Sequence, residues 1–192
     1  MPFVTIIIPY KSNLKYLYLA LKSVFNQSYK NFKLIIIYDN TYKKDLEKIK
    51  IFLKKKNYSK KFNIKIIVNR KNYGAGESRN IAIRESNSKY IAFLDSDDIW
   101  SKNKLKTQVN YMEKNNILFS HTSYDIINDN NKIISSRLAK NKIIFQDLIT
   151  SCDIGLSTVI LKSSLLNKNK LFFPKIKTKE DYVLWLKIVK KI

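Results

Sequence analysis

The stretch from Tyr90 to Asp98 reads YIAFLDSDD and decides the expected fold. An apolar run opens it, and the carboxylates of Asp95, Asp97 and Asp98 follow directly. A strand that is apolar on both faces is typical of a parallel sheet that helices cover on both sides. Side chains at i and i+2 of an extended segment point the same way, so Asp95 and Asp97 can share one ligand. We therefore expect a buried strand that ends in a ligand-binding loop.

The same alternation of apolar runs and helical patterns extends in both directions from this stretch. Other apolar runs lie at residues 4–8, 34–37 and 64–68, and helical patterns lie at residues 14–25, 43–56, 78–85 and 102–114. Alternating strands and helices of these lengths predict an α/β fold with a parallel sheet flanked by helices.

Polar residues follow each of these apolar runs. They are Pro9-Tyr10, Asp39-Asn40, Asn69-Arg70 and the acidic cluster Asp95–Asp98. Because the carboxyl ends of parallel strands meet at one rim, and ligands bind in the crevice there, we expect these groups to converge on one site.

The second half of the chain has a different pattern. Residues 117–127 and 132–135 are expected to form strands around an Asn/Asp turn, and residues 156–161 a further strand. Apolar side chains at Tyr182, Trp185, Leu186 and Val189 predict a last helix. That pattern stops at Ile192 without a stop signal, as in a chain truncated relative to a complete enzyme.

The composition restricts the class of protein. The chain has 192 residues and a net charge of +22, which suits anionic partners, although a Lys-, Asn- and Ile-rich codon bias explains the charge equally well. A single cysteine excludes an internal disulfide. Neither a leader sequence nor a membrane-spanning apolar run is found, so we expect a cytoplasmic protein, with contact to the inner face of the membrane left open.

The acidic cluster at Asp95–Asp98 has two interpretations. Closely spaced carboxylates repel one another unless a cation lies between them, and Mg²⁺ or Mn²⁺ is the natural partner of oxygen ligands. Alternatively, the cluster is an acidic turn before the helix at residues 102–114, with Ser101 as its N-cap. Similar capping roles compete for Asp39 and for Asp181, which follows Thr178 at capping-box spacing.

Six segments occur in the order and at the spacing of one known family. They are VTIIIPY (4–10), SVFNQSYKNF (23–32), LIIIYD (34–39), NYG with SRNIA (72–74 and 78–82), YIAFLDSDD (90–98) and EDYVLWL (180–186). Together they resemble the family 2 inverting glycosyltransferases of the bacterial surface-polysaccharide and lipooligosaccharide type. The resemblance implies a GT-A fold, a mixed α/β sheet flanked by helices. It implies one domain over residues 1–192, with a donor-binding half (1–98) and an acceptor-side half (99–192).

The resemblance also implies a role for each matching residue. The residues expected to bind the nucleotide-sugar donor are Pro9, Tyr10, Asp39, Arg79, Asp95 and Ser96. Asp39 would bind the base, Arg79 would lie near the base or the diphosphate, and Asp95 would contact the ribose or the sugar. Asp97, together with Asp95, would hold Mn²⁺ or Mg²⁺. Asp181 would be the general base that deprotonates the acceptor hydroxyl.

The expected activity follows from these roles. A sugar passes from a nucleotide-diphosphate sugar, for which uridine is the family's usual nucleoside, to a hydroxyl of a cell-surface glycan or lipid-linked precursor. A carboxylate near the attacking hydroxyl and a cation on the leaving diphosphate suit a single inverting displacement.

Other classes of protein remain as alternatives. A basic nucleic-acid-binding domain would account for the charge, although no recognised binding motif is present. A nucleotidyltransferase also uses paired carboxylates, but residues 9–14 contain no glycine for a phosphate loop. A truncated, inactive transferase is a further alternative.

Four single residues are expected to be structural rather than catalytic. They are His121, Cys152 as a small buried side chain, and Trp100 and Trp185 as packing residues, Trp100 with the alternative of edging the sugar pocket. The lysine runs 54–56 and 60–61 are expected to be solvated, with membrane contact as the alternative.

Overall fold

The computed structural model describes residues 3–192. The strands are β1 (Val4–Tyr10), β2 (Phe32–Tyr38), β3 (Asn63–Val68), β4 (Tyr90–Phe93), β5 (Phe119–Ser120), β6 (Tyr124–Ile127), β7 (Ile133–Arg137) and β8 (Ile160–Lys162). The helices are α1 (Leu14–Phe25), α2 (Lys43–Lys55), α3 (Tyr58–Lys61), α4 (Ala75–Arg84), α5 (Lys104–Lys114), α6 (Phe145–Thr150), α7 (Ser163–Asn169) and α8 (Glu180–Val189). A 3₁₀ turn, η1, spans Leu156–Thr158.

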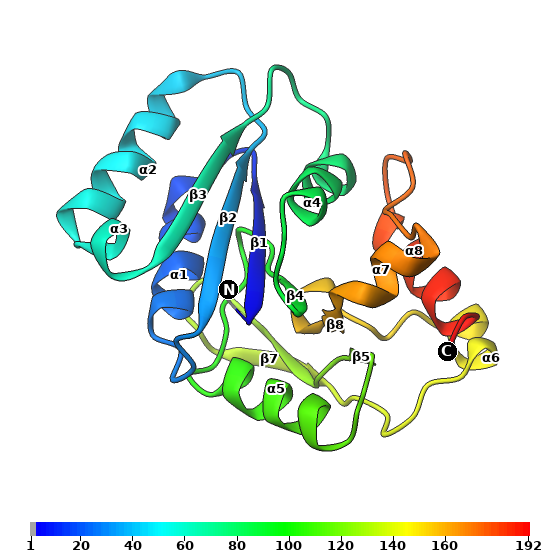
Figure 1. Cartoon of the computed structure of the whole chain (residues 1–192). Coiled ribbons are helices and arrows are strands. Elements are labelled where there is room, and N and C mark those ends of the chain that lie inside the picture. Colours follow the sequence, from blue (N-terminus) through cyan, green and yellow to red (C-terminus); the bar gives the residue numbers. More distant parts are fainter. Residues whose placement is uncertain (1–2) are drawn as a thin grey trace.

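A mixed six-stranded sheet with the order β3-β2-β1-β4-β8-β5 forms the centre of the molecule (Figure 1). The strands β3, β2, β1 and β4 run parallel, whereas β8 is antiparallel to both β4 and β5. In the register, Ile7 of β1 lies between Ile35 of β2 and Phe93 of β4. The predicted mixed α/β sheet is therefore confirmed, with the first strand buried beside the strand that precedes the acidic cluster.

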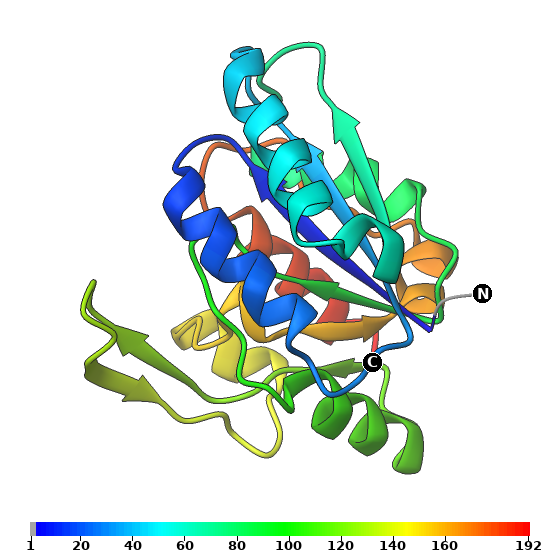
Figure 2. The same cartoon turned by 90° about the vertical axis from the view of Figure 1, so that its left-hand side faces the viewer.

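Helices cover both faces of the sheet because β1 and β2 are apolar on both sides. Ile6 and Ile8 pack with α1, α2 and α5 on one face, and Ile7 packs with α4, α7 and α8 on the other. Figures 1 and 2 show these two helical layers on opposite sides of the strands. The alternation of side chains along an extended strand thus assigns successive residues of β1 to two separate cores.

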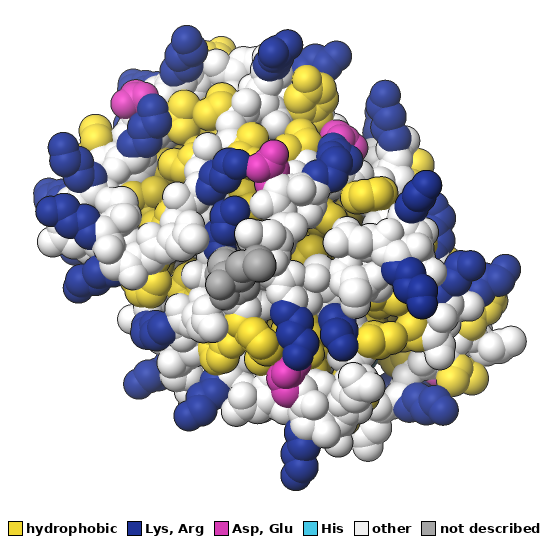
Figure 3. Space-filling model, in the orientation of Figure 1, with side chains coloured by type: hydrophobic (Ala, Val, Ile, Leu, Met, Phe, Trp, Pro, Cys, Tyr) yellow, Lys and Arg dark blue, Asp and Glu magenta, His cyan; other side chains and the backbone are white. Residues whose placement is uncertain are grey.

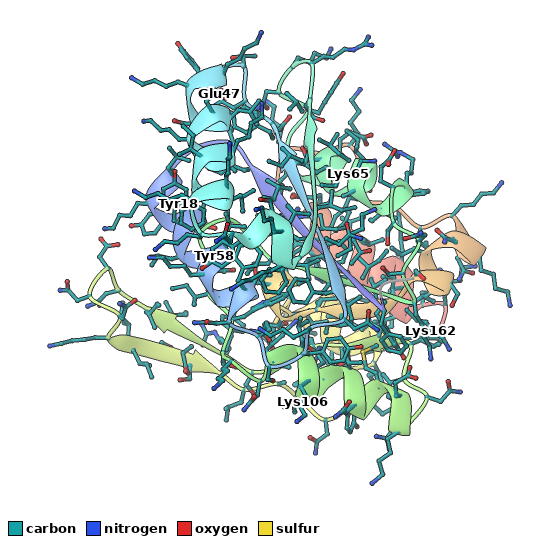
Figure 4. The ribbon with its side chains drawn as sticks, turned by 60° about the vertical axis from the view of Figure 1, so that its left-hand side comes forward. Tyr18, Glu47, Tyr58, Lys65, Lys106 and Lys162 are labelled. Atoms are coloured by element: carbon teal, nitrogen blue, oxygen red, sulfur yellow. The ribbon has the colours of Figure 1, made fainter. Side chains whose placement is uncertain are left out.

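Stacked aromatic rings join α1 to the Lys-rich helices α2 and α3. The ring of Tyr18 stacks on Phe52 at 4.3 Å, and the ring of Tyr58 stacks on Phe25 at 3.9 Å between centroids. Figure 4 shows Tyr18 and Tyr58 on the same side of the sheet, with Glu47 further along α2. The lysine runs 54–56 and 60–61 are exposed, in agreement with the expectation that they are solvated.

The second half departs from the predicted strands in two places. Only Phe119–Ser120 of the expected strand at 117–124 pairs with the sheet, and residues 156–158 form η1 before the short strand β8. The Thr158 hydroxyl donates a 2.6 Å bond to the carbonyl of Gly155, which stabilises a turn where an apolar pattern predicted a strand. The strands β6 and β7 pair only with each other, and their hairpin projects from the body of the molecule (Figure 2).

No helix in residues 3–192 has both the length and the apolar character that crossing a bilayer requires.

Candidate functional site

A cleft of about 540 Å³ lies at the carboxyl ends of β1, β2 and β4. The segments that line it are residues 9–13, Tyr16, Asp39, Asn72, Gly74, Ala75, Arg79 and residues 95–97. All of the residues expected to bind donor or metal therefore lie around one opening, although they come from distant parts of the sequence. Of the polar residues after β3, Arg70 is exposed and does not line the cleft, contrary to expectation. Asn69 reaches the site only through its contact with Asp39.

The carboxylate of Asp39 organises one wall of the cleft. It is 3% exposed and accepts hydrogen bonds from the backbone N–H groups of Tyr73 and Gly74, both at 2.8 Å. The side-chain amide of Asn69 donates a third bond at 2.7 Å. Gly74 has a φ of +86° and precedes α4, so Asp39 fixes the turn that leads into this helix. The helix after β2 is instead preceded by Tyr42, which makes no side-chain cap, and the alternative capping role for Asp39 is wrong.

The guanidinium of Arg79 connects the two halves of the chain at this cleft. Its Nη2 lies 2.6 Å from Asp95 and its Nη1 lies 2.9 Å from Glu180 at the start of α8. The Arg79 side chain is 6% exposed and its plane lies over the ring of Phe173. Gly76 permits this arrangement, since a Cβ there would meet the Glu180 side chain at 3.0 Å. Arg79 thus pairs with two carboxylates of the protein itself.

The loop after Asp95 is fixed from three directions. Ser157 accepts the backbone N–H of Asp95 at 3.0 Å, and Ser23 accepts the N–H of Trp100 at 3.1 Å. The buried side chain of Gln27 accepts the N–H of Leu105 at 3.0 Å and donates to a backbone carbonyl of the same loop at 2.7 Å. Residues 23–27 (SVFNQ), at the end of α1 and directly after it, therefore hold the acidic loop in place. We did not predict these contacts, because a polar residue in a helical pattern carries no signal of its partner.

Of the acidic cluster, Asp97 lines the cleft together with Asp95, whereas Asp98 does not. Within residues 3–192, neither the Asp97 nor the Asp98 carboxylate takes part in an ion pair. Partial burial raises the pKa of Asp98, a hydrogen bond with Ser157 lowers it, and the neighbouring charges of Asp95 and Asp97 raise it further. The helix after this loop, α5, has Asn103 as its N-cap residue and no side-chain cap, so the alternative in which Ser101 caps this helix is wrong.

A metal ion at this position would draw on few protein ligands. In the described part of the chain, no group of three or more His, Cys, Asp or Glu side chains is arranged to hold one. Mg²⁺ is commonly held by one or two carboxylates together with substrate phosphates, and Asp97 with one oxygen of Asp95 meets that requirement. The other oxygen of Asp95 is paired with Arg79.

Asp181 lies beside the cleft rather than in its lining. It is half-buried in the first turn of α8, next to Glu180. Burial is the main cause that raises the pKa of Asp95. The charge of Arg79 lowers this pKa, whereas the charges of Asp97 and Asp181 raise it further. The N-cap residue of α8 is Lys179, in the left-handed conformation and without a side-chain cap, so the alternative of a capping box formed by Thr178 and Asp181 is wrong.

A second pocket of about 680 Å³ lies on the other side of Asp97. The loop from Asp97 to Ser101, Lys104, residues 122–127 and η1 contribute most of its lining. Trp100 belongs to it and is 7% exposed, donating a 2.7 Å bond from Nε1 to the carbonyl of Ser157. Trp185 is fully buried in the core, as expected for a packing residue.

Two of the remaining expectations concern His121 and Cys152. His121 is half-buried and its pKa is lowered by burial, which fits a structural role. Cys152 is exposed rather than buried, because it lies in the irregular segment between α6 and η1 rather than in an element that packs on the sheet. Across the face in Figure 3, Lys and Arg side chains are scattered and do not gather into one patch.

Comparison with known proteins places the chain in a family. The model described as Glycosyl transferase family 2 matches residues 5–172. The chain belongs to this family, and the predicted family is confirmed.

Two curated relatives from Escherichia coli carry the same description, UDP-Glc:alpha-D-GlcNAc-diphosphoundecaprenol beta-1,3-glucosyltransferase. WfgD is 40% identical over 171 residues, which are 89% of this chain and 63% of that protein. WfaP is 34% identical over 194 residues, covering 100% of this chain and 72% of that protein. The chain thus spans less than two thirds of the length of WfgD.

Solved structures identify the fold. The structure of S. aureus TarS 1-349 matches with a TM-score of 0.79 and 22% identity, covering 97% of this chain and 55% of that one. The mannosyltransferase PcManGT from Pyrobaculum calidifontis, in complex with GDP-Man and Mn²⁺, matches with a TM-score of 0.73 and 13% identity over 97% of this chain and 52% of that one. The fold is GT-A, as predicted.

Removal of the Arg79 guanidinium should destabilise the protein because two carboxylates lose their partner. We expect Arg79→Leu to lower the free energy of unfolding by at least about 2 kcal/mol, with Asp95 contributing less because it is a third exposed. Arg84 pairs with Glu77 at the surface of the same helix, and Arg84→Leu should cost less than about 1 kcal/mol. Urea unfolding measures both. Equal losses would contradict the role assigned to Arg79.

Proposed function

We propose that the chain transfers a sugar from a uridine-diphosphate sugar to a hydroxyl of a diphosphate-linked lipid precursor of a surface glycan, with inversion and with a divalent ion. The observation that carries the proposal is the cleft in which Asp39, Asp95 and Asp97 converge at the carboxyl edge of the sheet. Supporting it, relatives at 40% and 34% identity are described as UDP-Glc glucosyltransferases acting on such an acceptor, and TarS is solved with UDP and with UDP-GlcNAc.

In this proposal the donor lies along the cleft. The base lies against the backbone of the Pro9-Tyr10 segment and the turn that Asp39 fixes, while Asp95 and Ser96 contact the ribose or the sugar. The N-terminus of α4, which begins at Ala75 in the cleft lining, faces the diphosphate, because unpaired N–H groups at a helix start favour anions. Arg79 acts mainly as a positioning residue that holds Asp95 and α8 together.

The metal would be held by Asp97, with Asp95 as the second carboxylate. A bound Mn²⁺ or Mg²⁺ supplies positive charge that stabilises the leaving diphosphate. Hydrogen bonds from Ser23, Gln27 and Ser157 fix the acidic loop, so Asp97 is positioned to hold this ion before the donor arrives.

The acceptor would bind on the far side of Asp97, mostly against residues 99–192, while residues 1–98 hold the donor. Asp181 removes the proton of the attacking hydroxyl, and attack opposite the leaving diphosphate inverts the anomeric carbon. A lipid-linked acceptor implies that the chain works in the cytoplasm at the inner face of the membrane. A nucleic-acid partner is less favoured, because the sequence contains no recognised nucleic-acid-binding motif.

Donor binding tests the proposal directly. We expect UDP to bind with a dissociation constant below 1 mM, about the weak limit of a typical enzyme–substrate affinity, when calorimetry is carried out with Mn²⁺. We expect clearly weaker binding when EDTA replaces the ion. Asp97→Ala should remove this dependence on Mn²⁺, whereas Glu47→Ala, an exposed acid on α2 (Figure 4), should keep it. Absence of metal-dependent nucleotide binding by the wild type would contradict the proposal.

Loss of the base should separate chemistry from donor binding. We expect Asp181→Asn to lower kcat for transfer by about 10²–10⁴-fold, the usual contribution of a general base. The affinity for UDP should stay within about twofold, because Asp181 does not line the donor cleft. Initial rates with UDP-glucose, together with UDP calorimetry on the same preparation, measure both quantities. A variant with full kcat would show that another group removes the proton.

A further inference from the structure

The side-chain nitrogen of Lys104 is buried and has no hydrogen-bond partner among the described residues. This residue begins α5 and lines the second pocket. The nearest recorded contact is the face of Trp100, whose ring centroid lies 4.1 Å from Nζ. A buried ammonium normally has an anionic partner, because loss of hydration is costly, so this one is free to bind a ligand.

The charged groups around the pocket do not neutralise it. Asp97 and Asp98 line the pocket from the loop after β4, and Asp125 lines it from β6. None of them forms an ion pair with Lys104 in the described structure, and Asp125 instead accepts a bond from Ser136. Burial alone lowers the pKa of the Lys104 ammonium, consistent with the absence of a nearby carboxylate. No other Lys or Arg lines this pocket.

We propose that Lys104 binds a phosphate group of the acceptor, and that the second pocket is the part of the site that selects diphosphate-linked acceptors. This inference rests on the proposed function and names the acceptor group that the chain recognises. Lys has four flexible carbon–carbon bonds and a compact ammonium, so a change in its terminal torsions brings Nζ from the Trp100 face to a ligand oxygen.

The position and shape of the pocket support an acceptor phosphate. Asp97 lines both this pocket and the donor cleft, so a molecule here lies next to the sugar to be transferred. The volume of about 680 Å³ suits a sugar with an attached phosphate. Ile126 and Ile127 of β6 line one wall and are each 41% exposed, which provides an apolar surface for the start of a lipid chain.

Acceptor binding to the UDP-loaded protein tests the inference. The two probes are GlcNAc α-linked to a short alkyl diphosphate and GlcNAc α-linked directly to the same alkyl chain, measured by saturation-transfer NMR with UDP and Mn²⁺ present. We expect the wild type to bind the diphosphate probe about tenfold more tightly or better, the scale of a charge-assisted hydrogen bond. Lys104→Met should lose this preference and keep its affinity for the neutral probe and for UDP.

Lys106 provides the matched control on the same helix. It is exposed (Figure 4), so Lys106→Met removes one positive charge from α5 without touching the pocket, and it should keep the preference. Equal binding of both probes by the wild type, or a preference that survives in Lys104→Met, would overturn the inference. Failure of UDP to bind would instead overturn the proposed function, and this inference with it.

Thermal stability distinguishes a ligand-binding lysine from a structural one. Because the ammonium is buried and unpaired, Lys104→Met should raise the melting temperature of the ligand-free protein by about 3 °C or more. Lys106→Met should leave it nearly unchanged. A clear fall in melting temperature for Lys104→Met would show that the charge supports the fold, and would contradict a role reserved for the acceptor.

Discussion

The ion pairs of Arg79 connect the parts of the molecule on which the site depends. One guanidinium bonds to Asp95, at the end of the central strand β4, and to Glu180, at the start of the last helix. Residues separated by about half of the chain are thereby held at one edge of the sheet. The close approach requires Gly76, where a side chain would meet Glu180. Breaking these pairs would leave the buried charges of Arg79 and Glu180 without a partner, which costs free energy.

A second constraint is the rigidity of the acidic loop. The loop forms hydrogen bonds with Ser23 in α1, with Gln27 just after α1, and with Ser157 in η1. Burial is the main cause that raises the pKa of Asp95 and of Asp98, and repulsion among the closely spaced carboxylates adds to it. A site assembled in this way favours a cation before any substrate is present, and positions both pockets on either side of Asp97.

The sequence allowed the sheet and the cleft to be predicted, because apolar runs and the polar residues after them follow directly from parallel-strand geometry. Asp39 and Asp97, each of which follows an apolar run, both line the cleft as this geometry predicts. The sequence did not reveal η1, where Thr158 turns the chain inside a predicted strand. It also did not reveal the contact between Arg79 and Glu180, which lie 101 residues apart. Lys104 was also missed, since a lysine in a helical pattern is normally expected at the surface.

The most direct test of the central claim is a crystal structure of the protein with UDP and Mn²⁺. The account predicts the nucleotide in the cleft beside Asp39, the ion between the diphosphate and Asp97, and Arg79 still bridging Asp95 and Glu180. A nucleotide bound outside the cleft, or an ion held without Asp97, would contradict it.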